Sequence, residues 1–209
     1  MDGVIVHSNP VHCEAWRLYN RRFGIQTDAA MLARMYGRHN DDIVRDYFGG
    51  GLSPEEIAAH GAAKEELYRA LMAPRLEQAL VAGVREFLAR HAGRPLAVAT
   101  NAEPANAAFV LDNAGLRPFF RVVIDGHMAG RPKPFPDVYL RAAAALGTDP
   151  SVCLVFEDSP AGVEAARAAG MRTIGVRTTY AELPGVELAI DDFTSTELEP
   201  WLSCHIPAC

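Results

Sequence analysis

The sequence predicts an α/β protein whose core is a parallel sheet and whose second domain is a helical insertion. From about residue 80 to 192, short apolar runs alternate with Ala-rich helical stretches, and this order of strand, helix and strand builds a parallel sheet covered by helices. Residues 10–78 contain no strand-like run, and helical patterns follow one another there. We therefore expect a core domain of residues 1–9 and 79–209 and a helical domain of residues 10–78.

Helical patterns in the insertion cover residues 11–23, 41–48 and 54–72. The last has the clearest beginning, because Ser53 can cap it, Pro54 stands at its first position and acidic residues fill its first turn.

Apolar runs in the core predict strands at residues 95–100, 122–124, 152–156 and 173–176. Ala-rich patterns between them predict helices at residues 106–113, 137–146 and 161–169. The carboxyl ends of parallel strands are where such sheets bind ligands, so the polar residues that follow these strands are the candidate site.

Composition and charge exclude several classes of protein. The formal net charge is −6 and the 20 Lys and Arg residues form no run, which argues against a nucleic-acid-binding surface. No apolar stretch reaches about 18 residues and no signal-like segment follows Met1, so we expect neither a membrane span nor export. The four cysteines form no CxxC pair, and we expect reduced thiols in a cytoplasmic protein.

Lys133 stands among three prolines, just ahead of the helix predicted from Asp137. Prolines stiffen the loop, so the ammonium group is held in one place at low entropic cost. It can be a solvated lysine on a rigid surface loop, or a fixed cation that neutralises a phosphate or a carboxylate nucleophile.

Glu157 and Asp158 are adjacent acids at the end of a predicted strand. Burying both is costly unless a cation lies beside them, and carboxylates in a loop suit Mg²⁺. The alternative is an acidic turn that caps the following helix, although Gly162, early in that helix, favours a close backbone approach at a site.

Thr100 and Asn101 offer a hydroxyl group, an amide and main-chain N–H groups at the end of another predicted strand. This combination binds phosphate oxygens well, but it also fits a plain helix cap.

The chemistry-bearing motifs occur in a characteristic order: Asp-Gly-Val near the start, a strand then Thr-Asn, Lys-Pro-x-Pro-Asp, and a strand then Glu-Asp-Ser-x-x-Gly. This set resembles the haloacid dehalogenase-like (HAD) hydrolase superfamily, in particular the subfamily with a helical cap that contains beta-phosphoglucomutase and sugar phosphatases. The resemblance covers residues 1–192 and implies a Rossmann-like core that holds Mg²⁺ and phosphate, closed by a four-helix cap.

The resemblance also implies roles for individual residues. Asp2 matches the second aspartate of the family's DxDG motif, the general acid and base, whose main-chain carbonyl also holds the metal. Thr100 matches the phosphate-binding hydroxyl and Lys133 the orienting lysine, while Glu157 and Asp158 match the metal-side carboxylates.

Met1 takes the middle position of DxDG, so the nucleophilic aspartate and the apolar strand before it do not occur in the sequence. Losing about six buried residues would remove roughly 10 kcal/mol of apolar stabilisation, so we expect this chain to fold poorly by itself. Three explanations are open: a polypeptide that begins upstream with Asp directly before Met1, a truncated chain, and a pseudoenzyme.

The resemblance further implies substrate contacts in the cap. His12 matches a histidine that bridges to the catalytic acid, and Lys64 matches a lysine that reaches the substrate. Without the resemblance, each fits a solvent-facing helix residue. The mutase's phosphate-binding arginine falls at Asn40, although Arg38 or His39 could replace it.

Glu103 follows Asn101 and Ala102, where the mutase has polar residues that hold a second phosphate. An acid there would repel that phosphate, which favours a phosphatase over a mutase. We expect a Mg²⁺-dependent enzyme acting on a small, sugar-like phosphomonoester, with no nucleic-acid or membrane partner, as a monomer or weak dimer. A phosphomutase, a non-catalytic phosphometabolite-binding module and, more weakly, a dehalogenase are the alternatives.

Overall fold

The computed structural model describes residues 1–35 and 38–206. Its named strands lie in two sheets, and every pairing in them is parallel, as predicted. The first sheet pairs β1 (Ala97–Ala99) with β2 (Val122–Ile124). The second has the order β3-β4-β5, from β3 (Leu154–Glu157), β4 (Arg172–Val176) and β5 (Leu188–Ile190).

An apolar cavity of about 540 Å³ lies between the two sheets. It is lined by all three residues of β1, by Leu154, Val155 and Phe156 of β3, and by Met1. Within the described residues, β1 pairs with β2 alone and β3 pairs with β4 alone. The two sheets therefore do not join into one along this cavity.

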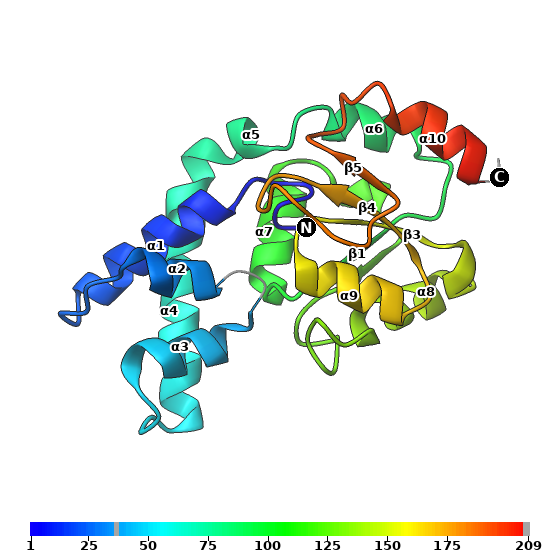
Figure 1. Ribbon diagram of the computed structural model, residues 1–209. Coiled ribbons are helices and arrows are strands. Elements are labelled where there is room, and N and C mark those ends of the chain that lie inside the picture. The colour runs from blue at the N-terminus through cyan, green and yellow to red at the C-terminus, as the bar shows by residue number, and fades with distance from the viewer. Residues whose placement is uncertain (36–37, 207–209) are drawn as a thin grey trace.

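Helices cover the sheets from several sides (Figure 1). The core helices are α5 (Leu76–Ala79), α6 (Val84–Arg90), α7 (Pro104–Asn113), α8 (Asp137–Leu146), α9 (Pro160–Ala168) and α10 (Leu198–His205). Helix α8 packs on β1 and β2, and α9 packs on β3 and β4.

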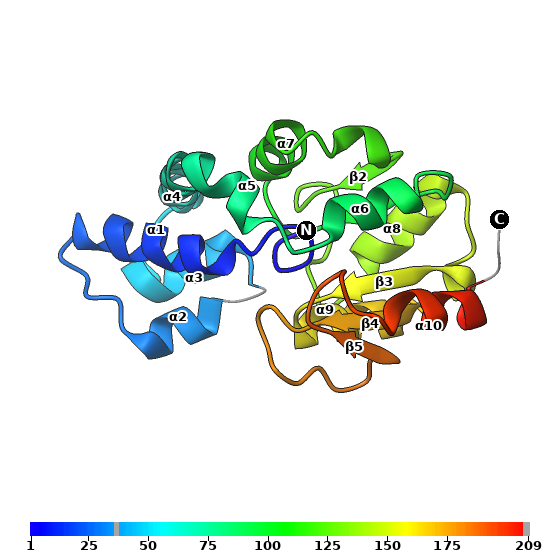
Figure 2. The ribbon, with the colours of Figure 1, turned by 90° about the horizontal axis from the view of Figure 1, so that it is seen from above.

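Four helices follow the opening loop: α1 (Asn9–Arg21), α2 (Ala29–Met35), α3 (Asn40–Phe48) and α4 (Pro54–Met72). Figures 1 and 2 show them gathered on one side of the strands. The predicted Ser53 cap of α4 is confirmed, and it forms part of a capping box: Ser53 Oγ accepts from the Glu56 N–H at 3.2 Å, and Glu56 accepts from the Ser53 N–H at 2.7 Å.

The four helices have an apolar cluster of their own, which includes Trp16, Tyr47 and Ile57. Tyr68 and Met72, near the end of α4, instead belong to the large cluster that fills the core. The exact division of the chain into residues 10–78 and the rest therefore stays a prediction. None of the helices in the described ranges is both long and apolar enough to cross a membrane.

Candidate active site

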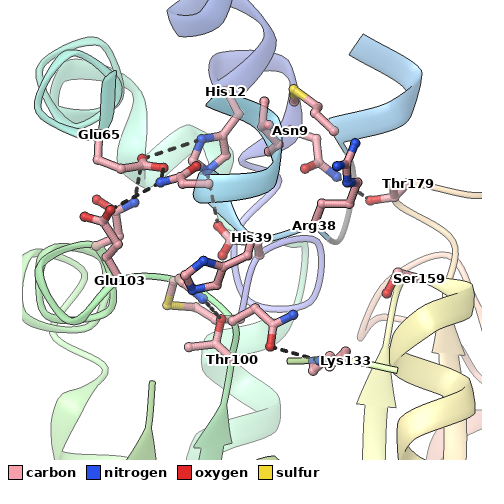
Figure 3. Close-up of a pocket in the computed structure, with 18 of the residues that line it drawn as sticks. Asn9, His12, Arg38, His39, Glu65, Thr100, Glu103, Lys133, Ser159 and Thr179 are labelled. Carbon is pink, nitrogen blue, oxygen red and sulfur yellow. Dashed lines mark hydrogen bonds and ion pairs between the residues drawn. The ribbon is translucent and has the colours of Figure 1, made fainter. Parts of the chain in front are cut away.

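The carboxyl ends of β1 and β3 meet α1, α3 and α4 at a polar pocket of about 140 Å³ (Figure 3). Every site residue predicted from the sequence lines it: Asp2, His12, Arg38, Lys64, Thr100, Asn101, Lys133, Glu157 and Asp158. The remainder of the lining includes Met1, His39, Asn40, Glu65, Glu103, Asn106 and Thr179.

Lys133 is not a solvated surface lysine. Its side chain is 10% exposed, and its ammonium group forms an ion pair with Glu157. Lys133 Nζ also lies 4.8 Å from the centroid of the Tyr139 ring, a cation–π geometry. The loop therefore holds one ammonium group at the carboxyl end of β3.

Donors surround the Glu157 carboxylate on both oxygens. Lys133 and the Tyr139 hydroxyl, at 2.6 Å, donate to Oε1, and the N–H groups of Asp158 and Ser159 donate to Oε2 at 2.9 and 3.2 Å. Burial alone would raise the pKa of Glu157, but the charge of Lys133 and the hydrogen bonds from Lys133 and Tyr139 outweigh it and lower the pKa to about 2.

Gly162 is required by this arrangement, because a Cβ atom at that position would lie 2.0 Å from the carboxyl carbon of Glu157. The expected close approach of backbone at Gly162 is thus present, and the group that fills the space is the Glu157 carboxylate.

The pKa of Asp158 is shifted in the direction opposite to that of Glu157. Burial, followed by the negative charge of Glu157, raises its pKa to about 7, although the Thr179 hydroxyl donates to it. Gly3 packs directly against this carboxylate: its φ is +67°, and a Cβ there would lie 1.9 Å from Asp158 Oδ2. The positive charges of the Met1 amino group and Lys133 also act on Asp158, but they do not outweigh burial and the charge of Glu157.

Asp2 accepts a hydrogen bond from Ser8 Oγ at 2.6 Å, and its Oδ1 lies 3.7 Å from His12 Nε2. Burial alone would raise the pKa of Asp2. The hydrogen bond and charge of His12, the Met1 amino group and the Ser8 hydroxyl outweigh burial, so the pKa lies well below its usual range.

His12 and Lys64 are both inside the pocket rather than on a solvated helix face. The His12 ring stacks on Tyr68 with centroids 3.8 Å apart, and its Nδ1 lies 3.1 Å from Lys64 Nζ. The side chain of Lys64 is 2% exposed.

Glu65 is a pocket residue that the sequence did not single out. It accepts from Lys64 at 2.6 Å and from the amides of Asn40 and Asn106, each at 2.7 Å. Burial would raise its pKa, but the charges of Lys64 and His12 and the hydrogen bonds hold it at about 2. The sequence carries a weak signal, since position 65 falls on the helix face marked by Ile57, Gly61, Tyr68 and Met72.

Thr100 and Asn101 lie where they were expected, but not as a helix cap. Thr100 is buried, and its Oγ1 accepts from the Ala102 N–H at 3.1 Å, whereas Glu103 occupies the N-cap position of α7. Asn101 Oδ1 accepts from the main-chain N–H of Lys133 at 3.5 Å, so the Thr100 loop and the Lys133 loop are in contact.

Arg38 lines the pocket, but its guanidinium group is bound to Asp46 of α3. Its predicted role in binding substrate stays a prediction. Among the residues that the structure describes, no three His, Cys, Asp or Glu side chains converge as a metal cluster. The donor set still fits a hard cation beside Asp158, because a cation there would offset the charge that raises its pKa.

Comparisons with known proteins identify relatives of this chain. The chain is 34% identical over 180 residues to fructose-1-phosphate phosphatase YqaB of Escherichia coli, covering 85% of this chain and 93% of that protein. It is 27% identical over 208 residues to beta-phosphoglucomutase of Bacillus subtilis, covering 95% and 90%.

The crystal structure of beta-phosphoglucomutase from Clostridium difficile matches the fold with a TM-score of 0.85 at 23% identity, covering 96% of this chain and 92% of that chain. The predicted α/β fold is therefore confirmed. A profile of haloacid dehalogenase-like hydrolases matches residues 1–170, and the chain belongs to that family of enzymes.

Proposed function

We propose that this protein is a phosphatase that hydrolyses a small, sugar-like phosphomonoester with the help of Mg²⁺. The observation that carries the proposal is the convergence of Asp2, Thr100, Lys133 and Asp158 in one buried pocket. A fixed ammonium group, a buried hydroxyl group and main-chain N–H groups suit a phosphoryl group, and the pocket's small volume suits a small substrate.

Asp2 is proposed to donate a proton to the leaving oxygen and then to accept one from water. Ser8 and His12 hold its carboxylate in place. The low pKa of Asp2 belongs to the pocket without substrate, and a phosphate dianion beside it would raise that pKa, which makes protonation and donation easier.

Mg²⁺ would be held by Asp158 and by the main-chain carbonyl of Asp2, and it would offset negative charge on the transferring phosphoryl group. Glu157 could reach the ion only by giving up donors that it now binds. Its contacts support a further role, in which Glu157 positions the Lys133 ammonium group.

The nucleophile is proposed to be an aspartate on an extended segment joined to Met1 that fills the cavity between β1 and β3. Met1 lines both this apolar cavity and the polar pocket. A residue attached to its amino group would therefore lie close to both the cavity and the pocket. The apolar lining and the two strand edges that face it suit an added parallel strand.

The test compares the 209-residue chain with one that also carries the segment encoded in frame before Met1. Each is assayed for phosphate release from p-nitrophenyl phosphate and a panel of sugar phosphates, with Mg²⁺ and with EDTA. We expect phosphate release only from the extended chain, and only in the presence of Mg²⁺. A well-folded extended chain that binds Mg²⁺ yet hydrolyses nothing in the panel would contradict the phosphatase and favour the binding module.

A further inference from the structure

The half of the pocket away from Lys133 holds two carboxylates, Glu65 and Glu103 (Figure 3). They differ in their partners. Glu65 is compensated, because the Lys64 ammonium group donates to it at 2.6 Å and forms a buried ion pair with it. Glu103 has a neutral partner, the side-chain amide of Asn40, which donates to its Oε1 at 3.2 Å.

No Lys, Arg or His of the described ranges forms an ion pair with Glu103. Of the basic side chains that line the pocket, Arg38 is bound to Asp46 and His39 lies 3.9 Å from Asp41. The Glu103 charge therefore acts on whatever enters this end of the pocket.

Asn40 fixes Glu103 in place. Its amide nitrogen donates both to Glu65 of α4 at 2.7 Å and to Glu103 at 3.2 Å, so one side chain of α3 joins the helical segment to the loop that follows β1. The Glu103 oxygen is thus held at the pocket wall, where a hydroxyl group can donate to it and an anion cannot approach without repulsion.

We infer that Glu103, positioned by Asn40, restricts the substrate to monophosphates whose leaving group is an uncharged polyol and rejects those with a second phosphate or a carboxylate. The inference rests on the proposed phosphatase function and deepens it. Carboxylate oxygens accept hydrogen bonds from sugar hydroxyls, so the same atom that favours a polyol excludes an anion.

The test uses fructose 1-phosphate and fructose 1,6-bisphosphate, which differ by one phosphate. For the extended chain we expect a kcat/KM for the monophosphate that exceeds that for the bisphosphate by roughly tenfold or more. Glu103→Gln keeps the size and removes the charge. Its kcat/KM should fall severalfold for the monophosphate and rise for the bisphosphate, which lowers the ratio by roughly tenfold.

A merely structural role for Glu103 predicts that both values fall in proportion and the ratio stays unchanged, and this result would overturn the inference. Helix α7 does not use the Glu103 side chain as a cap, so the variant retains that helix. Glu66→Gln on the exposed face of α4 is the matched control, because it removes the same charge outside the pocket and should leave the ratio unchanged.

Failure of the proposed function is separable from failure of the inference. If the wild-type extended chain hydrolyses neither sugar phosphate nor p-nitrophenyl phosphate, the phosphatase is wrong. The binding of the same two sugar phosphates is then measured by calorimetry in wild type and in Glu103→Gln. A ratio of their two Kd values that moves toward the bisphosphate in the variant supports the inference, and an unchanged ratio overturns it.

Discussion

The Lys133 ammonium group forms an ion pair with Glu157, and this contact joins the proline-rich loop to the carboxyl end of β3. Both side chains are nearly inaccessible, with exposed fractions of 10% and 4%. Removing one residue of such a buried ion pair is strongly destabilising, because the remaining charge is left buried without its partner.

Lys133→Met should therefore lower the free energy of unfolding by about 3–5 kcal/mol, measured by urea titration. The double variant Lys133→Met with Glu157→Gln should recover most of this loss, since it leaves no unpaired charge. A single variant that costs less than about 1 kcal/mol would show that Glu157 does not depend on Lys133 for its charge.

Gly162→Ala should destabilise the protein by about 1–3 kcal/mol, because the new methyl group would displace the Glu157 carboxylate. Gly61→Ala is the matched control in another helix, where the nearest atom to the added Cβ is 3.7 Å away. It should be neutral or stabilise by up to about 1 kcal/mol, since alanine is the better helix former. Equal effects of the two variants, measured as unfolding midpoints, would contradict the account of Gly162.

Glu65 should make the free energy of unfolding depend on pH in the acidic range. Its pKa in the folded protein is lowered from 4.5 to about 2, so its stabilisation is present above the unfolded pKa and is lost as the pH falls through this range. Glu65→Gln should be less stable than wild type by roughly 1–3 kcal/mol at neutral pH, and the difference should shrink between about pH 5 and pH 3. Urea titrations across this range measure the difference, and one that does not change with pH would speak against a lowered pKa.

Asp158→Asn should stabilise the metal-free protein and weaken its binding of Mg²⁺. The folded pKa of Asp158 is raised to about 7, so its charged form opposes folding, and this cost grows as the pH rises from about 4 to about 7. The variant removes that cost at pH 8. Urea titration in EDTA tests the stability, and calorimetry tests the affinity for Mg²⁺. A variant that is less stable yet binds Mg²⁺ normally would refute both expectations.

Long periodic segments and motif order were enough to predict much of the fold. The predicted range 137–146 is that of α8, and 54–72 is that of α4. The sequence did not reveal β5, Leu188–Ile190, because its Leu-Ala-Ile run is poorer in β-branched residues than the Val-Val-Ile run of β2. Helix α10 was also not predicted, and it continues to His205 because Leu198 and Leu202 are buried in the core.

The site residues that lie next to conspicuous strand ends were predictable, whereas their partners were not. Tyr139 and Thr179 bind Glu157 and Asp158 across 18 and 21 residues of sequence, and nothing local marks either of them. Glu65 was missed because its neighbour Lys64 and the surrounding acids suggested a solvated face. Such contacts depend on the tertiary packing of α4 and the loops, which a single sequence does not display.

The central claim is that Asp2 performs acid–base chemistry on a phosphomonoester in this pocket. Its most direct test is the steady-state hydrolysis of fructose 1-phosphate by the extended chain, with Mg²⁺, in wild type and Asp2→Asn. The account predicts that kcat falls by roughly 10²–10⁴-fold in the variant while the unfolding midpoint is retained, because asparagine can still accept the Ser8 hydrogen bond. A folded Asp2→Asn variant with nearly wild-type kcat would contradict it.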